Sequence, residues 1–122
     1  MPPAGRPLPC AAIVYRSIFQ AQLEDGEVGL TAFHLKPKDD GELSVWRGAQ
    51  AAWTRLNRVK RVRSLHAGRV RTLGLEITED PDDAEHALIL GLPSPYDSDE
   101  SFLAANRLAA ALLAMSRPVE PA

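Results

Sequence analysis

The stretch AAIVYRSIF at residues 11–19 decides the fold. It is a nearly continuous run of apolar, β-branched and aromatic residues. Such a run is typical of a strand that is buried on both faces, so we predict a central strand here. Arg16 interrupts the run. A buried arginine needs a partner, and we expect an Asp or Glu from another element to meet it.

The elements that follow are predicted from hydrophobic spacing and turn residues. Residues 28–35 and 43–46 are predicted to be strands. Residues 49–65 are predicted to form a helix, because apolar residues recur there every three or four positions. Residues 69–78 and 86–92 are predicted strands. A last helix is expected over about residues 99–116, capped by Asp97 or Ser98, with Phe102 on its wide apolar face.

This order, strand-strand-strand-helix-strand-strand-helix, predicts an α+β fold. Short links favour a mostly antiparallel sheet of about five strands, and two helices can cover one face to give a two-layer sandwich. Proline-rich ends suggest a disordered leader over residues 1–10 and a disordered tail over 118–122. The expected single domain covers residues 11–117.

Composition places the chain among ordinary globular domains. It has 122 residues, of which 45% are hydrophobic and 25% charged. Cys10 is the only cysteine, so no internal disulfide can form. We recognise neither a signal peptide nor an apolar run long enough to span a membrane. These features predict a cytoplasmic protein without a membrane partner.

The net charge of −2 hides an uneven distribution. Residues 1–75 contain twelve Lys or Arg against six Asp or Glu, and residues 76–122 contain two against ten. Charge separated in this way either steers a partner or pairs within the fold, and the sequence does not decide between them.

Phosphate-binding, dinucleotide-binding, zinc and serine-hydrolase motifs are absent from the sequence. We therefore expect no cofactor and no metal site. Three regions carry candidate residues. The loop after residue 33 contains His34, Lys36, Lys38, Asp39 and Ser44. There a histidine could act as acid or base and the lysines could hold an anion, although a solvated turn explains the same pattern.

The second region is basic and lies within residues 53–71. Its candidate binding residues are Arg55, Arg58, Lys60, Arg61 and Arg63. On a helix they would form a stripe suited to phosphate contacts, or a solvated face that pairs with acidic residues. The third region is the acidic run before His86. Carboxylates beside this histidine would raise its pKa if they pair with it, and a solvated acidic loop is the alternative.

Two blocks carry a resemblance to known sequences. They are A-F-x(4)-K-D-x-G-x-L-S-V at residues 32–45 and E-H-A-x-I-x-G-L-P at residues 85–93. With V-Y-R at residues 14–16, they resemble small uncharacterised bacterial proteins, over about a quarter of the chain. His34-Leu35 and the very basic segment depart from that pattern. No activity is attached to these proteins, so the resemblance supplies no catalytic residues.

The sequence favours a non-enzymatic, protein-binding component of a bacterial assembly, because charge is polarised and no catalytic motif is present. One alternative is a nucleic-acid-binding protein that uses residues 53–71. Another is a small enzyme with His34, His86 or Ser44 in catalysis and Arg16, Lys36 or Lys38 holding an anion. The partner, the oligomeric state and any reaction are left open.

Overall fold

The computed structural model describes residues 5–36 and 41–121. The main elements are a six-stranded sheet, a two-stranded hairpin, three α-helices and two 3₁₀ helices. They are β1 (Ile13–Ile18), η1 (Gln20–Gln22), β2 (Leu23–Glu24), β3 (Glu27–Val28), η2 (Leu30–Phe33), β4 (Glu42–Trp46), α1 (Ala49–Thr54), β5 (Arg61–His66), α2 (Ala67–Arg71), β6 (Glu76–Asp80), β7 (Asp83–Leu90), α3 (Asp99–Met115) and β8 (Arg117–Pro118). The α+β class and the mostly antiparallel sheet are confirmed.

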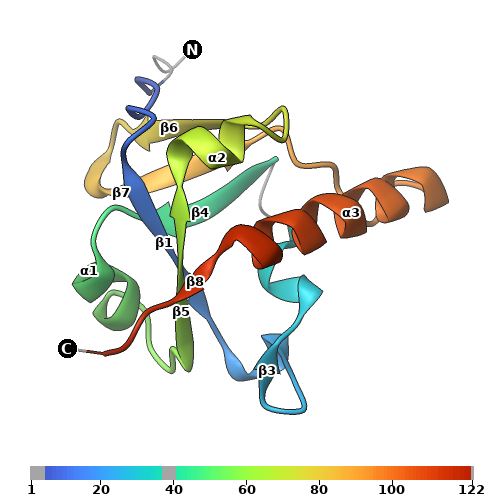
Figure 1. Cartoon of the computed structure of the whole chain (residues 1–122), viewed down its shortest axis with the longest axis horizontal. Helices are drawn as coiled ribbons and strands as arrows, with labels where there is room; N and C mark the ends of the chain where they lie inside the picture. Colours follow the sequence, from blue (N-terminus) through green and yellow to red (C-terminus); the bar gives the residue numbers. More distant parts are fainter. Residues whose placement is uncertain (1–4, 37–40, 122) are drawn as a thin grey trace.

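Strand β1 lies inside the sheet, as its apolar run predicts. The sheet order is β6-β7-β4-β1-β5-β8, and β1 pairs antiparallel with β4 and β5 (Figure 1). Val14 and Ile18 point to one face and pack in the larger apolar core. Tyr15 points to the other face and packs against a smaller cluster. Both faces of β1 are therefore used, which explains why its sequence does not alternate.

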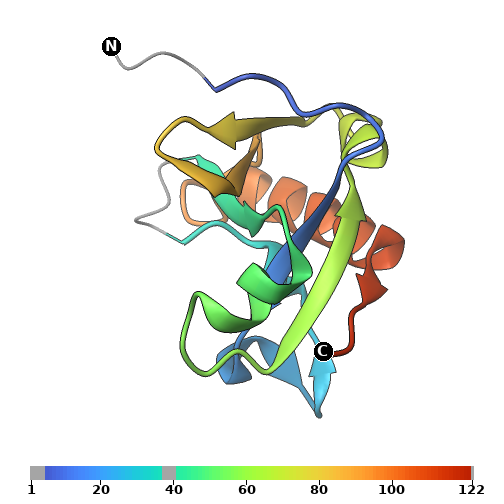
Figure 2. The ribbon, with the colours of Figure 1, turned by 90° about the vertical axis from the view of Figure 1, so that its left-hand side faces the viewer.

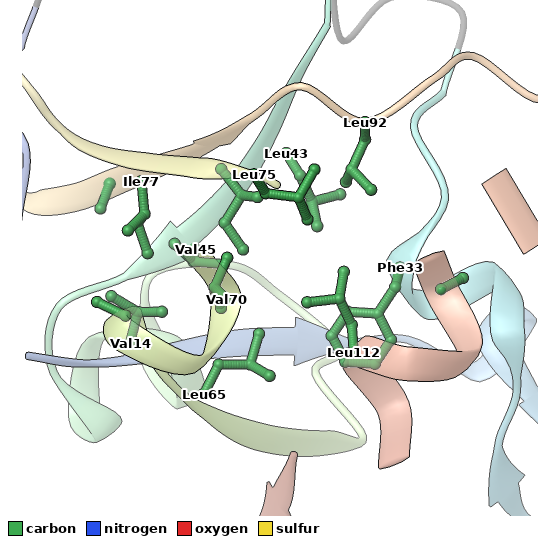
Figure 3. Packing of buried hydrophobic residues seen from close by; sticks show 14 of the residues in the cluster. Val14, Phe33, Leu43, Val45, Leu65, Val70, Leu75, Ile77, Leu92 and Leu112 are labelled. Carbon is green, nitrogen blue, oxygen red and sulfur yellow. The ribbon is translucent and has the colours of Figure 1, made fainter. Parts of the chain in front are cut away.

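The helices lie on both sides of the sheet. The larger core packs beneath α2, α3 and η2, and Figure 3 shows Val70 and Leu112 of the two helices among its side chains. The smaller cluster, which includes Trp46 and Val62, packs beneath α1 on the opposite face. Figure 2 shows α1 in front of the sheet and α3 behind it. None of the described helices is both long and apolar enough to cross a bilayer.

The predicted helix over residues 49–65 is wrong beyond Thr54. The chain turns after α1, with Arg58 at a φ of 66°, and then forms β5. Val62 and Leu65 are three residues apart, which fits a helical stripe. In a strand the same spacing sends them to opposite faces, and they do enter the smaller and the larger cluster respectively. Six backbone pairs with β1 accompany the strand.

Two further predicted strands differ from the structure. Residues 28–35 form only the end of β3 and the helical turn η2, which buries Ala32 and Phe33 against the core. Residues 69–78 divide into α2 and β6, and Gly74 takes a φ of 82° between them. That left-handed conformation suits glycine and ends the helical segment. The last helix agrees with its prediction, and Ser98 caps it by accepting a hydrogen bond from the Ser101 backbone N–H.

Both expected disordered ends contact the sheet where the structure describes them. Leu8 donates its backbone N–H to the Ile77 carbonyl and is buried. Gly5 lies so close to β6 that an added Cβ would be 1.8 Å from the Glu79 carbonyl oxygen. At the other edge, Val119 donates to the Val62 carbonyl. Buried apolar contact and backbone pairing therefore hold segments that proline content marked as frayed.

Candidate functional site

Arg16 is a buried cation of β1 that links two neighbouring elements through hydrogen bonds. Its side chain is 8% exposed, and its guanidinium donates to the carbonyls of Ala32 and Ser44, each at 2.8 Å. These contacts join η2 to β4 across the central strand. Charge-assisted hydrogen bonds of this kind stabilise buried carbonyls, so the geometry gives Arg16 a structural role.

The predicted loop site is only partly described. Lys38 and Asp39 lie outside the described residues, and Lys36 is exposed. His34 follows η2 and lines a small cavity of about 190 Å³ beside Tyr96. Its Nε2 is buried and has no hydrogen-bond partner in the described part of the chain.

His86 lies elsewhere. It sits on the face of the smaller cluster, where its ring centroid is 5.0 Å from that of Trp46. Its Nδ1 is 2.7 Å from Asp80 Oδ2. The pKa of Asp80 is lowered by a hydrogen bond from the Asp82 backbone N–H and then by His86. Since His34 follows η2 on the side of the larger core, the two histidines do not share a site.

Ser44 and His86 do share a face of the sheet. Ser44 pairs with Leu88, and Trp46 pairs with His86, on the neighbouring strands β4 and β7. The side chain of Ser44 is exposed there. The structure therefore groups Ser44 with His86 and Asp80, apart from His34 and Lys36.

The basic segment does not form one surface. Arg55 follows α1 and points to the β6–β7 hairpin, where it lies 2.8 Å from Asp83 and 3.4 Å from Glu85. Its guanidinium also stacks 4.9 Å from the centroid of the Trp46 ring. Arg58 is exposed in the turn. The predicted helical stripe is therefore absent, because the residues are divided between a turn and a strand.

The remaining cations of the segment converge on a cavity. Lys60, Arg61 and Arg63 line a half-open pocket of about 750 Å³ beside β5. Its other walls come from the β2–β3 hairpin and from the chain after β8. We call this the basic pocket. The residues of its lining used below are the cations Lys60, Arg61 and Arg63, the carboxylates Glu27 and Glu120, and the apolar residues Val28, Trp53, Leu113 and Val119. Sequence reasoning found its cations from charge alone and missed its apolar walls, which come from distant segments.

A second surface stands at the start of α3. Tyr96, Phe102 and Leu103 are 62%, 47% and 62% exposed, and we call them the α3 tip. Phe102 continues the buried stripe of Ala105 and Leu112, but the helix projects beyond the sheet at this end (Figure 1). The sequence predicted Phe102 on a covered face. Leu103, the next residue along α3, was missed because it does not belong to the predicted apolar stripe.

The two oppositely charged parts of the chain pair within the fold. Arg47 lies 3.7 Å from Glu79, and Arg71 lies 2.7 Å from Glu76. Both pairs, like those of Arg55, join residues 1–75 to residues 76–122. Charge that these pairs do not use includes the cations of the basic pocket and the carboxylates beside the α3 tip.

Comparison of the chain with protein-family models, with curated proteins and with solved structures finds no match. Within residues 5–36 and 41–121, no group of three or more His, Cys, Asp or Glu side chains is arranged to hold a metal ion.

Proposed function

We propose that this chain is a protein-binding domain of a bacterial assembly and that the α3 tip is its docking surface. The observation that carries the proposal is the exposure of the tip. Three of the five large hydrophobic side chains exposed among the described residues are Tyr96, Phe102 and Leu103. Tyr96 lies two residues before the capping Ser98, and Phe102 and Leu103 lie in the second turn of α3, so all three stand near the start of one helix. Exposed apolar groups concentrated in one region are typical of interaction sites, whereas scattered ones need no explanation.

The carboxylates beside the α3 tip indicate that the partner surface is basic. Asp97, Asp99 and Glu100 are exposed beside the tip. Asp99 and Glu100 also interact favourably with the positive end of the helix dipole, so part of their role is local. A protein that presents an apolar patch flanked by Lys or Arg would bury the tip and meet the carboxylates. Such complementarity raises the association rate and excludes acidic partners.

The alternatives receive less support from the geometry. Nucleic-acid binding was expected from a continuous basic helix, and the chain divides that segment between a turn and β5. Arg55 is engaged with Asp83 and Glu85. The small-enzyme hypothesis required His34 and His86 in one cleft, and they lie on different sides of the sheet.

A site-specific cross-linking experiment tests the proposal. A photoreactive side chain at Leu103 should capture a partner in cells of the source organism, and the same group at Ala110 should not. Ala110 is the matched control because it is exposed on the same side of α3, two turns further along. The captured peptide should contain Lys or Arg beside apolar residues.

Reconstitution with the purified partner completes the test. Leu103→Glu should weaken binding at least tenfold, whereas Ala110→Glu should leave it within twofold. Asp99→Lys should also weaken binding, and the loss should diminish as salt is raised. Capture that is equal at both positions, or a partner surface without basic residues, would refute the proposal. Capture of a second copy of this chain would show self-association in its place.

A further inference from the structure

The basic pocket is built from segments far apart in the sequence. Lys60 comes from the end of the link between α1 and β5, and strand β5 contributes Arg61 and Arg63. The β3 end of the hairpin contributes Val28, and the chain after β8 contributes Val119. Its volume of about 750 Å³ lies in the range of small-molecule sites. The α3 tip contributes none of the lining residues, so the pocket is independent of the proposed docking surface.

Arg63 is held in place without a carboxylate. Its Nε donates to Ser116 Oγ at 2.9 Å, and its Nη2 donates to the Ser116 carbonyl at 3.0 Å. Partial burial lowers the pKa of Arg63, which reflects the cost of removing the charge from water. These two neutral acceptors orient the guanidinium without forming an ion pair with it.

The neighbouring cations are also without carboxylate partners. Arg61 donates to the carbonyls of Lys60, at 2.9 Å, and Gly26, at 3.5 Å. No carboxylate in residues 5–36 and 41–121 lies within ion-pair distance of Lys60, Arg61 or Arg63, in contrast to Arg55 and Arg71. Cations that converge on a cavity and form no ion pair within the described residues are suited to bind an anion from solution.

The rest of the lining is largely apolar. Val28, Trp53, Leu113 and Val119 line the same cavity. The indole N–H of Trp53 is buried and has no acceptor among the described residues. An anion with an apolar body would cover the aliphatic wall, and an oxygen placed beside the Trp53 ring would supply the missing acceptor.

We propose that the basic pocket binds a small organic monocarboxylate whose body is apolar. The choice of a monoanion follows from the net charge of the lining. Lys60, Arg61 and Arg63 line the pocket together with Glu27 and Glu120, so three cations and two carboxylates leave one net positive charge. The planar fork of an arginine matches a carboxylate, and a dianionic phosphate would meet more repulsion from the two glutamates.

An NMR titration of the full chain with octanoate tests the inference. Octanoate should cause saturable shifts of the backbone signals of residues 60–63 and 119–120 and of the Trp53 indole. The signals of Tyr96 and Leu103 should stay fixed, so failure here is separate from failure of the docking proposal. Octan-1-ol, which has the same chain without charge, should bind at least fivefold more weakly.

Variants of single arginines identify the cations that bind the carboxylate of octanoate. Arg61→Gln should weaken octanoate binding at least fivefold, and Arg58→Gln should change it less than twofold, because Arg58 is exposed outside the pocket. Arg63→Gln should abolish saturable octanoate binding, but the hydrogen bonds of Arg63 to Ser116 also support the fold. Because Arg61 is exposed, the Arg61→Gln variant is expected to fold normally and therefore decides the test. Equal binding of octanol and octanoate, no saturable shift, or tighter binding of octyl phosphate would each overturn the proposal.

Discussion

Truncation of two leucines of α3 should affect the stability of the fold to very different extents. Leu112 is fully buried in the larger core, whereas Leu103 is 62% exposed at the α3 tip. Truncation of a buried leucine to alanine costs about 2–5 kcal/mol, since both the transfer energy and the packing of its neighbours are lost. For a domain of this size each kcal/mol lowers Tm by roughly 3–6 °C. Leu112→Ala should therefore lower Tm by at least about 6 °C.

Leu103→Ala should behave differently. Leu103 is already 62% exposed, so the burial that is lost is worth at most ~1 kcal/mol, and the better helix propensity of alanine offsets part of it. Urea denaturation of both variants, followed by fluorescence, measures the free energies of unfolding. A loss at Leu103 comparable to that at Leu112 would refute the reasoning, because it would mean that the tip is covered in solution.

Three further outcomes are expected. Gly5→Ala should detach the segment that pairs with β6, since its Cβ would meet the Glu79 carbonyl oxygen, and amide exchange along β6 should accelerate. Ser98→Ala should cost about 1 kcal/mol in urea denaturation, because Ser98 Oγ caps α3. The lowered pKa of Asp80 means that its carboxylate stabilises the fold above its unfolded pKa and loses this effect as pH falls through the lower folded pKa. The difference in unfolding free energy between the wild type and Asp80→Asn should be largest above the unfolded pKa of about 4 and should diminish as pH falls below it. A difference that stays constant with pH would contradict the stabilising role given to the Asp80 carboxylate, which accepts from the Asp82 backbone N–H and contacts His86.

The sequence predicted the elements whose pattern has one interpretation. Strand β1 is a short run rich in β-branched and aromatic residues, which favours a strand, and α3 combines a capping serine with a long apolar stripe. Residues 61–66 were misassigned because Val62 and Leu65 fit a helical stripe and a two-faced strand equally well. Backbone pairing with β1 selects the strand, and that information lies elsewhere in the chain.

The candidate sites likewise combine features that the sequence shows with features that depend on the fold. The charge of Lys60, Arg61 and Arg63 is visible in the sequence, but the pocket exists only because the hairpin and the chain after β8 stand beside β5. The exposure of Phe102 was also hidden. Its helical phase marks it as covered, and it is exposed because α3 is longer than the layer on which it packs. The spacing of apolar residues within one helix does not show how far the sheet beneath that helix extends.

Ion pairs within the fold account for part of the uneven charge distribution, and the charges that remain mark the two proposed sites. Arg47, Arg55 and Arg71 each bind a carboxylate from the acidic part of the chain, so much of the asymmetry stabilises the fold. Exposed pairs of this kind contribute little each, and salt weakens them. The basic pocket and the surroundings of the α3 tip hold opposite charges outside these pairs, each beside exposed or accessible apolar groups. Charge together with apolar surface distinguishes a recognition site from a solvated face, and for that reason these two surfaces, rather than the basic segment as a whole, carry the proposals.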